Sequence, residues 1–104
     1  MKFALPALMS LTLLSISPVS IAQDVSPLLQ KAGCIACHST DKKILGPAFK
    51  DVSVKYKDKN AAADVLNRVK NGSSGVWGPM PMPPNAGKLT DEEFKSVVDW
   101  ILAL

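Results

Sequence analysis

The sequence of 104 residues predicts an all-α fold of four to five short helices. Apolar residues recur at helical spacing in segments 48–56, 61–70 and 91–103. No segment alternates apolar and polar residues as a half-buried strand does. The last segment also begins with a capping box, in which Thr90 can cap the helix and Glu93 can bond back to Thr90.

The first 22 residues have the pattern of a secretory signal peptide. Lys2 supplies a positive start, residues 3–19 are largely apolar, and Ser20-Ile21-Ala22 is a small-x-small cleavage site. Prolines and hydroxyl residues interrupt the apolar run, which favours a removed signal over a membrane span. We expect a cleaved signal at 1–22 and one domain at 23–104. An uncleaved membrane anchor is the alternative.

The first two helices flank residues 34–47. Ser26 can cap a short amino-terminal helix with Pro27 at its first position, and Gly33 ends it. Pro47 can only start an element, so the second helix is predicted at 48–56 with Phe49 and Val52 on its apolar side.

Two more helices and a long loop complete the domain. Asn60 is expected to cap the helix at 61–70, and Asn71-Gly72 ends it. Residues 73–89 hold four prolines and have no periodic pattern, so we expect a loop with a binding role. The final helix places Phe94 and Val97 on one face and should cross the amino-terminal helix.

Residues 34–38 read Cys-Ile-Ala-Cys-His, which is the attachment signature of a c-type haem. Cys34 and Cys37 would each form a thioether with one haem vinyl group, and His38 would bind the iron from below. A thioredoxin-like dithiol would need a βαβ context, and a zinc site would need a fourth ligand. A simple disulfide remains possible, but it gives His38 no role.

A second axial ligand has to come from elsewhere in the chain. His38 is the only histidine, and its other ring nitrogen should donate to a backbone carbonyl. Methionine is the remaining natural ligand, and the mature chain has Met80 and Met82. Both are flanked by prolines, so spacing alone does not choose between them.

Three segments resemble the small bacterial class I monohaem cytochromes c: residues 33–38 (GCIACH), 46–49 (GPAF) and 75–85 (GVWGPMPMPPN). The resemblance covers essentially all of the mature chain in the same order. It implies short helices wrapped round one covalently attached haem c, with the terminal helices crossing. It also implies that the ligand methionine is the one before the double proline, Met82.

The same resemblance implies further contacts to the haem. The carbonyl of Pro47 would accept a hydrogen bond from His38. Arg68 and Trp77 would reach the haem propionates, and Asn85 would lie close to the Met82 sulfur. The alternatives are that Trp77 is only a core residue and that Arg68 is only a solvated charge.

The sequence therefore predicts a periplasmic one-electron carrier of a Gram-negative cell rather than an enzyme. Expected partners are a quinol-oxidising complex or donor cytochrome upstream, and a nitrite reductase or terminal oxidase downstream. Removal of Lys2 lowers the formal charge of +3 to +2, which argues against nucleic-acid binding. We expect a monomer without stable membrane association. The alternative is a ligand-binding or peroxidatic haem protein in which the methionine is displaced.

Lysines are concentrated in the first half of the mature chain. They form either an ordinary solvated face or a basic rim that steers docking to acidic partners. They are Lys31, Lys42, Lys43, Lys50, Lys55, Lys57 and Lys59.

Overall fold

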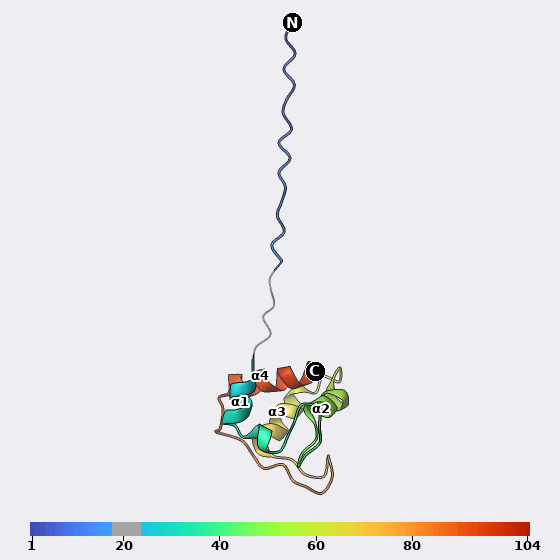
Figure 1. The fold of residues 1–104 in the computed structure, drawn as a ribbon, viewed down its shortest axis with the longest axis vertical. Helices are drawn as coiled ribbons and strands as arrows, with labels where there is room; N and C mark the ends of the chain where they lie inside the picture. Colours follow the sequence, from blue (N-terminus) through green and yellow to red (C-terminus); the bar gives the residue numbers. More distant parts are fainter. Residues whose placement is uncertain (18–23) are drawn as a thin grey trace.

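The computed structural model describes residues 1–17 and 24–104. The expected cleavage site at 20–22 lies outside the described residues. Residues 1–17 contain no helix or strand, and their large apolar side chains are exposed. They extend away from the domain in Figure 1. Within the described residues, none of the helices has both the length and the apolar character needed to span a bilayer.

The domain contains four α-helices and one short 3₁₀ turn. In chain order they are α1 (Ser26–Lys31), η1 (Cys34–Ala36), α2 (Phe49–Tyr56), α3 (Ala62–Asn71) and α4 (Asp91–Leu102). The described residues form no strand, only the isolated bridges His38–Lys43 and Ser73–Met82. The predicted all-α fold is confirmed.

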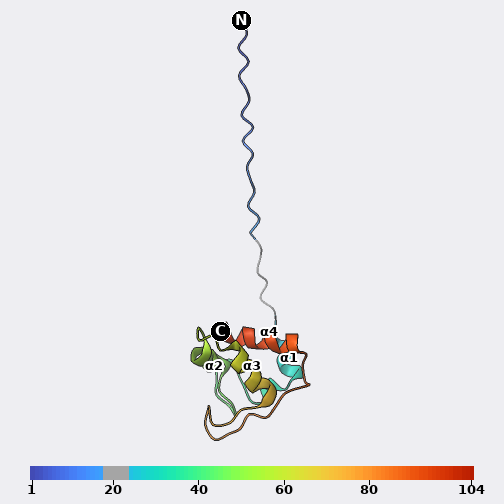
Figure 2. The same ribbon diagram turned by 180° about the vertical axis from the view of Figure 1, so that it is seen from behind.

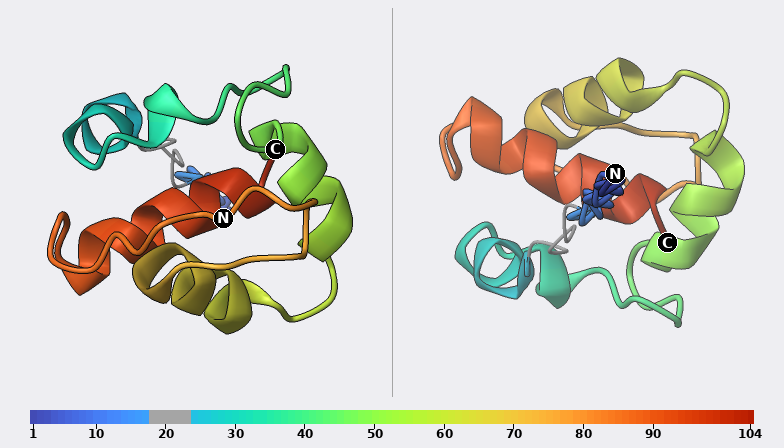
Figure 3. Two further views of the ribbon diagram at one scale, coloured as in Figure 1. Left: turned by 90° about the horizontal axis from the view of Figure 1, so that it is seen from below. Right: turned by 90° about the horizontal axis from the view of Figure 1, so that it is seen from above.

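Helix α4 is the centre of the packing. It contacts α1, α2 and α3, and Figure 3 shows it between α1 and α3 with α2 near its end. Phe94, Val97, Val98 and Ile101 are buried at helical spacing along one side of α4. Burial of each such side chain contributes about 1.5–3 kcal/mol relative to exposure. The apolar face of α4 therefore positions the other three helices.

The start of α4 agrees with the predicted capping box. Thr90 Oγ1 accepts a hydrogen bond from Glu93 N at 3.2 Å, and Glu93 Oε1 accepts one from Thr90 N at 3.0 Å. The bond from the Thr90 backbone is the main reason that the pKa of Glu93 lies below its ordinary value. Two N–H groups at this helix end are thus satisfied by side chains.

The two other predicted caps are wrong. Ser26 lies inside α1, which Val25 caps without a side-chain bond, and Asp24 Oδ1 accepts from Ser26 N at 3.0 Å. The Asp24 carboxylate thus accepts from the first N–H of the helix, two residues before the position predicted for the cap. Asn60 adopts a left-handed φ of 52°, and Ala61 caps α3 instead. Asparagine tolerates that region, so Asn60 shapes the turn before the helix.

The loop at 73–89 runs on the opposite side of the domain from α4, as Figures 1 and 2 both show. It is attached to α3 by backbone hydrogen bonds. Asn85 N donates to Val69 O and Lys70 O at 3.2 and 3.1 Å, and Ala86 N donates to Lys70 O at 3.0 Å. These bonds satisfy carbonyls at the carboxyl end of α3, which has no further turn to accept them. The loop is thereby held in front of the helical core.

Candidate functional site

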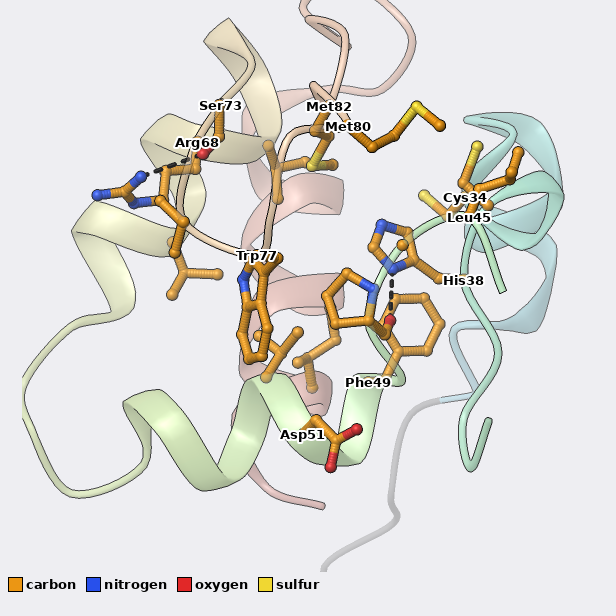
Figure 4. Close-up of a pocket in the computed structure, with 18 of the residues that line it drawn as sticks. Cys34, His38, Leu45, Phe49, Asp51, Arg68, Ser73, Trp77, Met80 and Met82 are labelled. Atoms are coloured by element: carbon orange, nitrogen blue, oxygen red, sulfur yellow. Dashed lines mark hydrogen bonds between the residues drawn. The ribbon is translucent and has the colours of Figure 1, made fainter. Parts of the chain in front are cut away.

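A cavity of about 480 Å³ lies between the 34–49 segment and the 73–83 loop. Volumes of this size are typical of cofactor sites. Most of its lining is apolar: Leu45, Pro47, Phe49, Val52, Val65, Val69, Val76, Pro81, Pro83, Val97 and Ile101. The polar and sulfur-bearing side chains lie at a few separate places along the wall of the cavity. Figure 4 shows their arrangement.

Cys34 and Cys37 form one part of the cavity wall, and both thiols are free. Gly33 precedes them with a left-handed φ of 74°, which lets the chain leave α1 and turn into η1. Within this turn, His38 N donates to Cys34 O at 2.9 Å. Burial is the main cause that raises the pKa of the Cys34 thiol. The turn presents two sulfurs and one imidazole to the same cavity.

The His38 ring is held in one orientation. Its Nδ1 lies 2.7 Å from the carbonyl oxygen of Pro47, and it stacks on Phe49 with ring centroids 5.2 Å apart. A carbonyl oxygen only accepts, so Nδ1 carries the hydrogen and Nε2 carries the lone pair. The predicted bond from His38 to Pro47 is therefore present. It leaves Nε2 able to bind a metal ion.

Gly46 makes room for this ring. A Cβ at Gly46 would lie 2.5 Å from His38 Cε1 and 2.9 Å from Nδ1, a clash with the imidazole. The Gly46 N–H also donates to Cys37 O at 2.7 Å, which ties this residue to the cysteine turn. Sequence reasoning did not assign a role to Gly46. Its position directly before Pro47 was the available signal.

The two methionines both line the cavity but differ in their surroundings. Met82 is partly buried, whereas Met80 is 60% exposed. Met82 N donates to Ser73 O at 2.8 Å, and Ser73 N donates to Met82 O at 3.1 Å. The backbone of Met82 is thus fixed on both sides, and both methionines lie above His38 in the view of Figure 4.

Arg68 and Trp77 line the cavity as well, away from the cysteines in Figure 4. Arg68 donates from Nε to Asp64 Oδ2 and from Nη1 to Ser73 Oγ, both at 3.1 Å. Trp77 is 39% exposed, and the Lys55 ammonium lies 5.4 Å from the centre of its ring. These groups make one end of an otherwise apolar cavity polar and cationic.

The expected closeness of Asn85 to the Met82 sulfur stays a prediction. Asn85 is buried but does not line the cavity. Its Nδ2 donates to Val69 O and Pro83 O, both at 3.1 Å, and its Oδ1 accepts from Lys88 Nζ at 3.0 Å. The side-chain amide of Asn85 thus donates to two backbone carbonyls. In the structure Asn85 braces the loop.

The lysines show no single arrangement. Lys43 lines the cavity and Lys55 lies over Trp77. Lys31 pairs with Glu93 at 3.6 Å and Lys50 pairs with Asp41 at 2.5 Å. Exposed pairs of this kind contribute at most about 1 kcal/mol. A basic rim round the cavity stays a prediction.

The residues that line the cavity fit a covalently held haem. Two free thiols and an oriented imidazole lie at one side, apolar side chains would cover the macrocycle, and Arg68 with Trp77 offers donors for carboxylates at the other side. Haem carries its vinyl and propionate groups at different edges, which matches this division. Fold and site together define an α-helical haem-binding protein.

Comparison with known proteins identifies the family. Residues 22–104 match the cytochrome c family. The chain is 47% identical over 83 residues to cytochrome c-551 of Pseudomonas aeruginosa, covering 79% of this chain and 78% of that one. It is 45% identical over 104 residues to cytochrome c-551 of Stutzerimonas stutzeri, covering 99% and 97%.

A solved structure gives the same result. The crystal structure of wild-type Nitrosomonas europaea cytochrome c552 aligns with a TM-score of 0.71 at 48% identity, over 76% of this chain and 98% of that chain. The chain belongs to the cytochrome c family, as a small class I monohaem cytochrome c. It is a c-type cytochrome electron carrier with one covalently attached haem c.

Proposed function

We propose that this cytochrome is a periplasmic one-electron carrier whose haem iron is bound by His38 and Met82. The observation that carries the proposal is that hydrogen bonds hold both candidate ligands in place at the same cavity, His38 through its ring and Met82 through its backbone. His38 is held through Nδ1 by Pro47 O at 2.7 Å. Met82 is held by a pair of backbone hydrogen bonds to Ser73.

The surroundings of the two methionines favour Met82 over Met80. A ligand bound in both oxidation states has to be held in place, and the Met82 backbone is paired while its side chain is partly buried. Gly72 lies close to the Met82 backbone, since a Cβ at position 72 would be 2.8 Å from Met82 O. Met80 is 60% exposed.

Two protein ligands suit electron transfer better than catalysis. The haem iron supplies the one-electron couple, and thioether sulfur raises its potential. Substrate has no open coordination position while both side chains are bound. Phe49, stacked on His38, and Ser73, paired with Met82, keep these ligands fixed, so little reorganisation accompanies a change of charge. This supports a carrier rather than an enzyme.

The alternative of a peroxidatic haem needs an acid or base on the methionine side. A carboxylate that sequence reasoning did not consider, Asp51, does line the cavity from α2. It lies on the Phe49 side of the cavity in Figure 4, away from Met80 and Met82. Its position does not favour the peroxidatic alternative.

Replacement of each methionine tests the ligand assignment. We expect Met82→Ala to lose the weak near-red absorption band of methionine-to-iron coordination in the oxidised holoprotein, because no sulfur remains at the paired position. Met80→Ala is the matched control and should keep the band. A Met82→Ala protein that retains the band, or a Met80→Ala protein that loses it, contradicts the assignment of Met82.

We also propose that redox partners dock at the mouth of the cavity. Exposed apolar side chains occur in the segments that border it: Ile35 at 52%, Ile44 at 48%, Leu45 at 57% and Met80 at 60%. Lys43 lines the same cavity and gives this face a positive charge. Acidic partners such as a nitrite reductase or terminal oxidase fit this chemistry, and the contact is expected to be small and brief.

The charge dependence of electron transfer tests this docking proposal. Second-order rate constants with an acidic reductase should fall about tenfold as salt rises from low to high ionic strength, because screening removes the steering. Lys43→Glu should slow the reaction at low salt, whereas Lys95→Glu, on the exposed side of α4, is the control. Rates that do not depend on salt would remove the charged-face proposal.

Periplasmic location is part of the proposal and depends on residues 1–22 acting as a cleaved signal. Supporting observations are the sequence pattern and a family match that begins at residue 22. The holoprotein purified from its native cell should begin at Gln23, with its mass increased by one haem. A mass that still includes Met1 to Ala22 would favour the membrane-anchored alternative.

A further inference from the structure

Ser73 makes contacts of two kinds at the cavity. Its backbone N and O pair with Met82 at 3.1 and 2.8 Å. Its side-chain Oγ accepts a hydrogen bond from Arg68 Nη1 at 3.1 Å. The hydroxyl is therefore directed to the arginine, while the backbone alone holds the methionine. The two contacts can be separated by removing only the hydroxyl.

The Arg68 guanidinium is fixed by bonds from two different segments. Asp64, one turn earlier on α3, accepts from Nε, and Ser73, in the following loop, accepts from Nη1. The Asp64 pair is exposed to solvent, and exposed i,i+4 pairs of this kind are weak. One weak bond leaves the planar group free to turn, whereas two bonds from different directions set its plane. Ser73 supplies the second bond.

Arg68 and Trp77 both line the polar end of the cavity. Cys34 and Cys37 lie away from Arg68 in Figure 4, and they would hold the vinyl edge of the haem. The haem carboxylates then fall on the side where Arg68 and Trp77 offer donors. This step rests on the proposed function, a haem held in this cavity, and on the contact between Arg68 and the haem carboxylates that the family resemblance implies.

We propose that Ser73 is a positioning residue that holds the Arg68 guanidinium toward the haem carboxylates and thereby sets the pH range in which the reduction potential changes. Ser73 touches neither the iron nor the carboxylates in this role. It acts through the orientation of Arg68.

The charges around Arg68 support this role. The hydrogen bond to Asp64 is the main cause that raises the pKa of Arg68 above its ordinary value, and the nearby Tyr56 adds to it. Arg68 is therefore a cation at every pH of interest. Besides Cys34, Cys37 and His38, the charged and titratable groups that face this end of the cavity or line it elsewhere are Asp64, Tyr56, Lys55, Asp51 and Lys43.

The direction of the effect follows from charge. A cation beside a carboxylate stabilises the ionised form and keeps its pKa low. Ionisation of a haem carboxylate favours the more positive oxidised iron, so the reduction potential falls as pH rises through that titration. Loss of the Ser73 hydroxyl loosens Arg68 and weakens its hold on the carboxylate. The pH range in which the potential falls should then move upward.

Reduction potentials of the holoprotein, measured between about pH 5 and pH 9, test the proposal. Ser73→Ala should move the pH-dependent range upward by about half a pH unit, the effect of a partly lost charge contact. Ser96→Ala is the control, since Ser96 does not line the cavity and its hydroxyl donates to Glu92 O at 3.1 Å on α4. Ser73→Thr keeps the hydroxyl and should restore the native range.

Arg68→Gln separates this proposal from the one on which it rests. If Arg68→Gln moves the range and Ser73→Ala does not, Arg68 faces the carboxylates but Ser73 does not position it. If neither variant moves the range, the contact of Arg68 with the carboxylates is wrong as well. When Ser73 acts through Arg68, adding Ser73→Ala to Arg68→Gln should cause no further shift. Loss of the near-red band in Ser73→Ala would mean that the hydroxyl acts on Met82, which overturns the proposal.

Discussion

The hydrogen bond from His38 Nδ1 to the carbonyl oxygen of Pro47 is the constraint on which the rest of the site depends. It fixes the tautomer, so that the lone pair is on Nε2, and it fixes the plane of the ring against Phe49. The bond requires a close approach of the 46–47 backbone to the imidazole. Only glycine at position 46 permits that approach, because a Cβ would lie 2.5 Å from the ring.

The opposite wall of the cavity is the 73–89 loop, and hydrogen bonds fix its position as well. The 73–89 loop has no helix or strand, yet the Ser73–Met82 bridge and the bonds from Asn85 and Ala86 to the end of α3 hold it at both ends. Prolines restrict the backbone between these points. A domain of about 82 residues has little apolar core of its own, and a haem between these two walls would add most of what is missing.

Much of the fold was predictable from local patterns. The capping box at Thr90 and the apolar positions of α4 follow directly from residue spacing, since both depend on contacts within one helix. The caps at Ser26 and Asn60 were wrong for two different reasons: Ser26 lies inside α1 and its N–H donates to the Asp24 carboxylate, and Asn60 adopts a left-handed φ one residue before the cap of α3. Both outcomes are decided by backbone geometry that spacing does not reveal.

The site was predictable where chemistry sets the residue type. Cys34, Cys37 and His38 were found from their spacing, and Pro47 from the family resemblance. Met80 and Met82 were not separable by spacing, because the difference between them lies in exposure and in pairing with a residue nine positions away. The roles of Gly46 and Ser73 depend on contacts across the cavity, and Asn85 turned out to brace the backbone, so these required the structure.

The central claim is that side chains of this chain occupy both axial positions of the haem iron, which makes the protein a carrier. Optical spectra of the purified wild-type holoprotein, recorded with and without carbon monoxide, test it most directly. The account predicts a low-spin haem in both oxidation states and a reduced spectrum that carbon monoxide leaves unchanged. A high-spin reduced haem that binds carbon monoxide readily would contradict it.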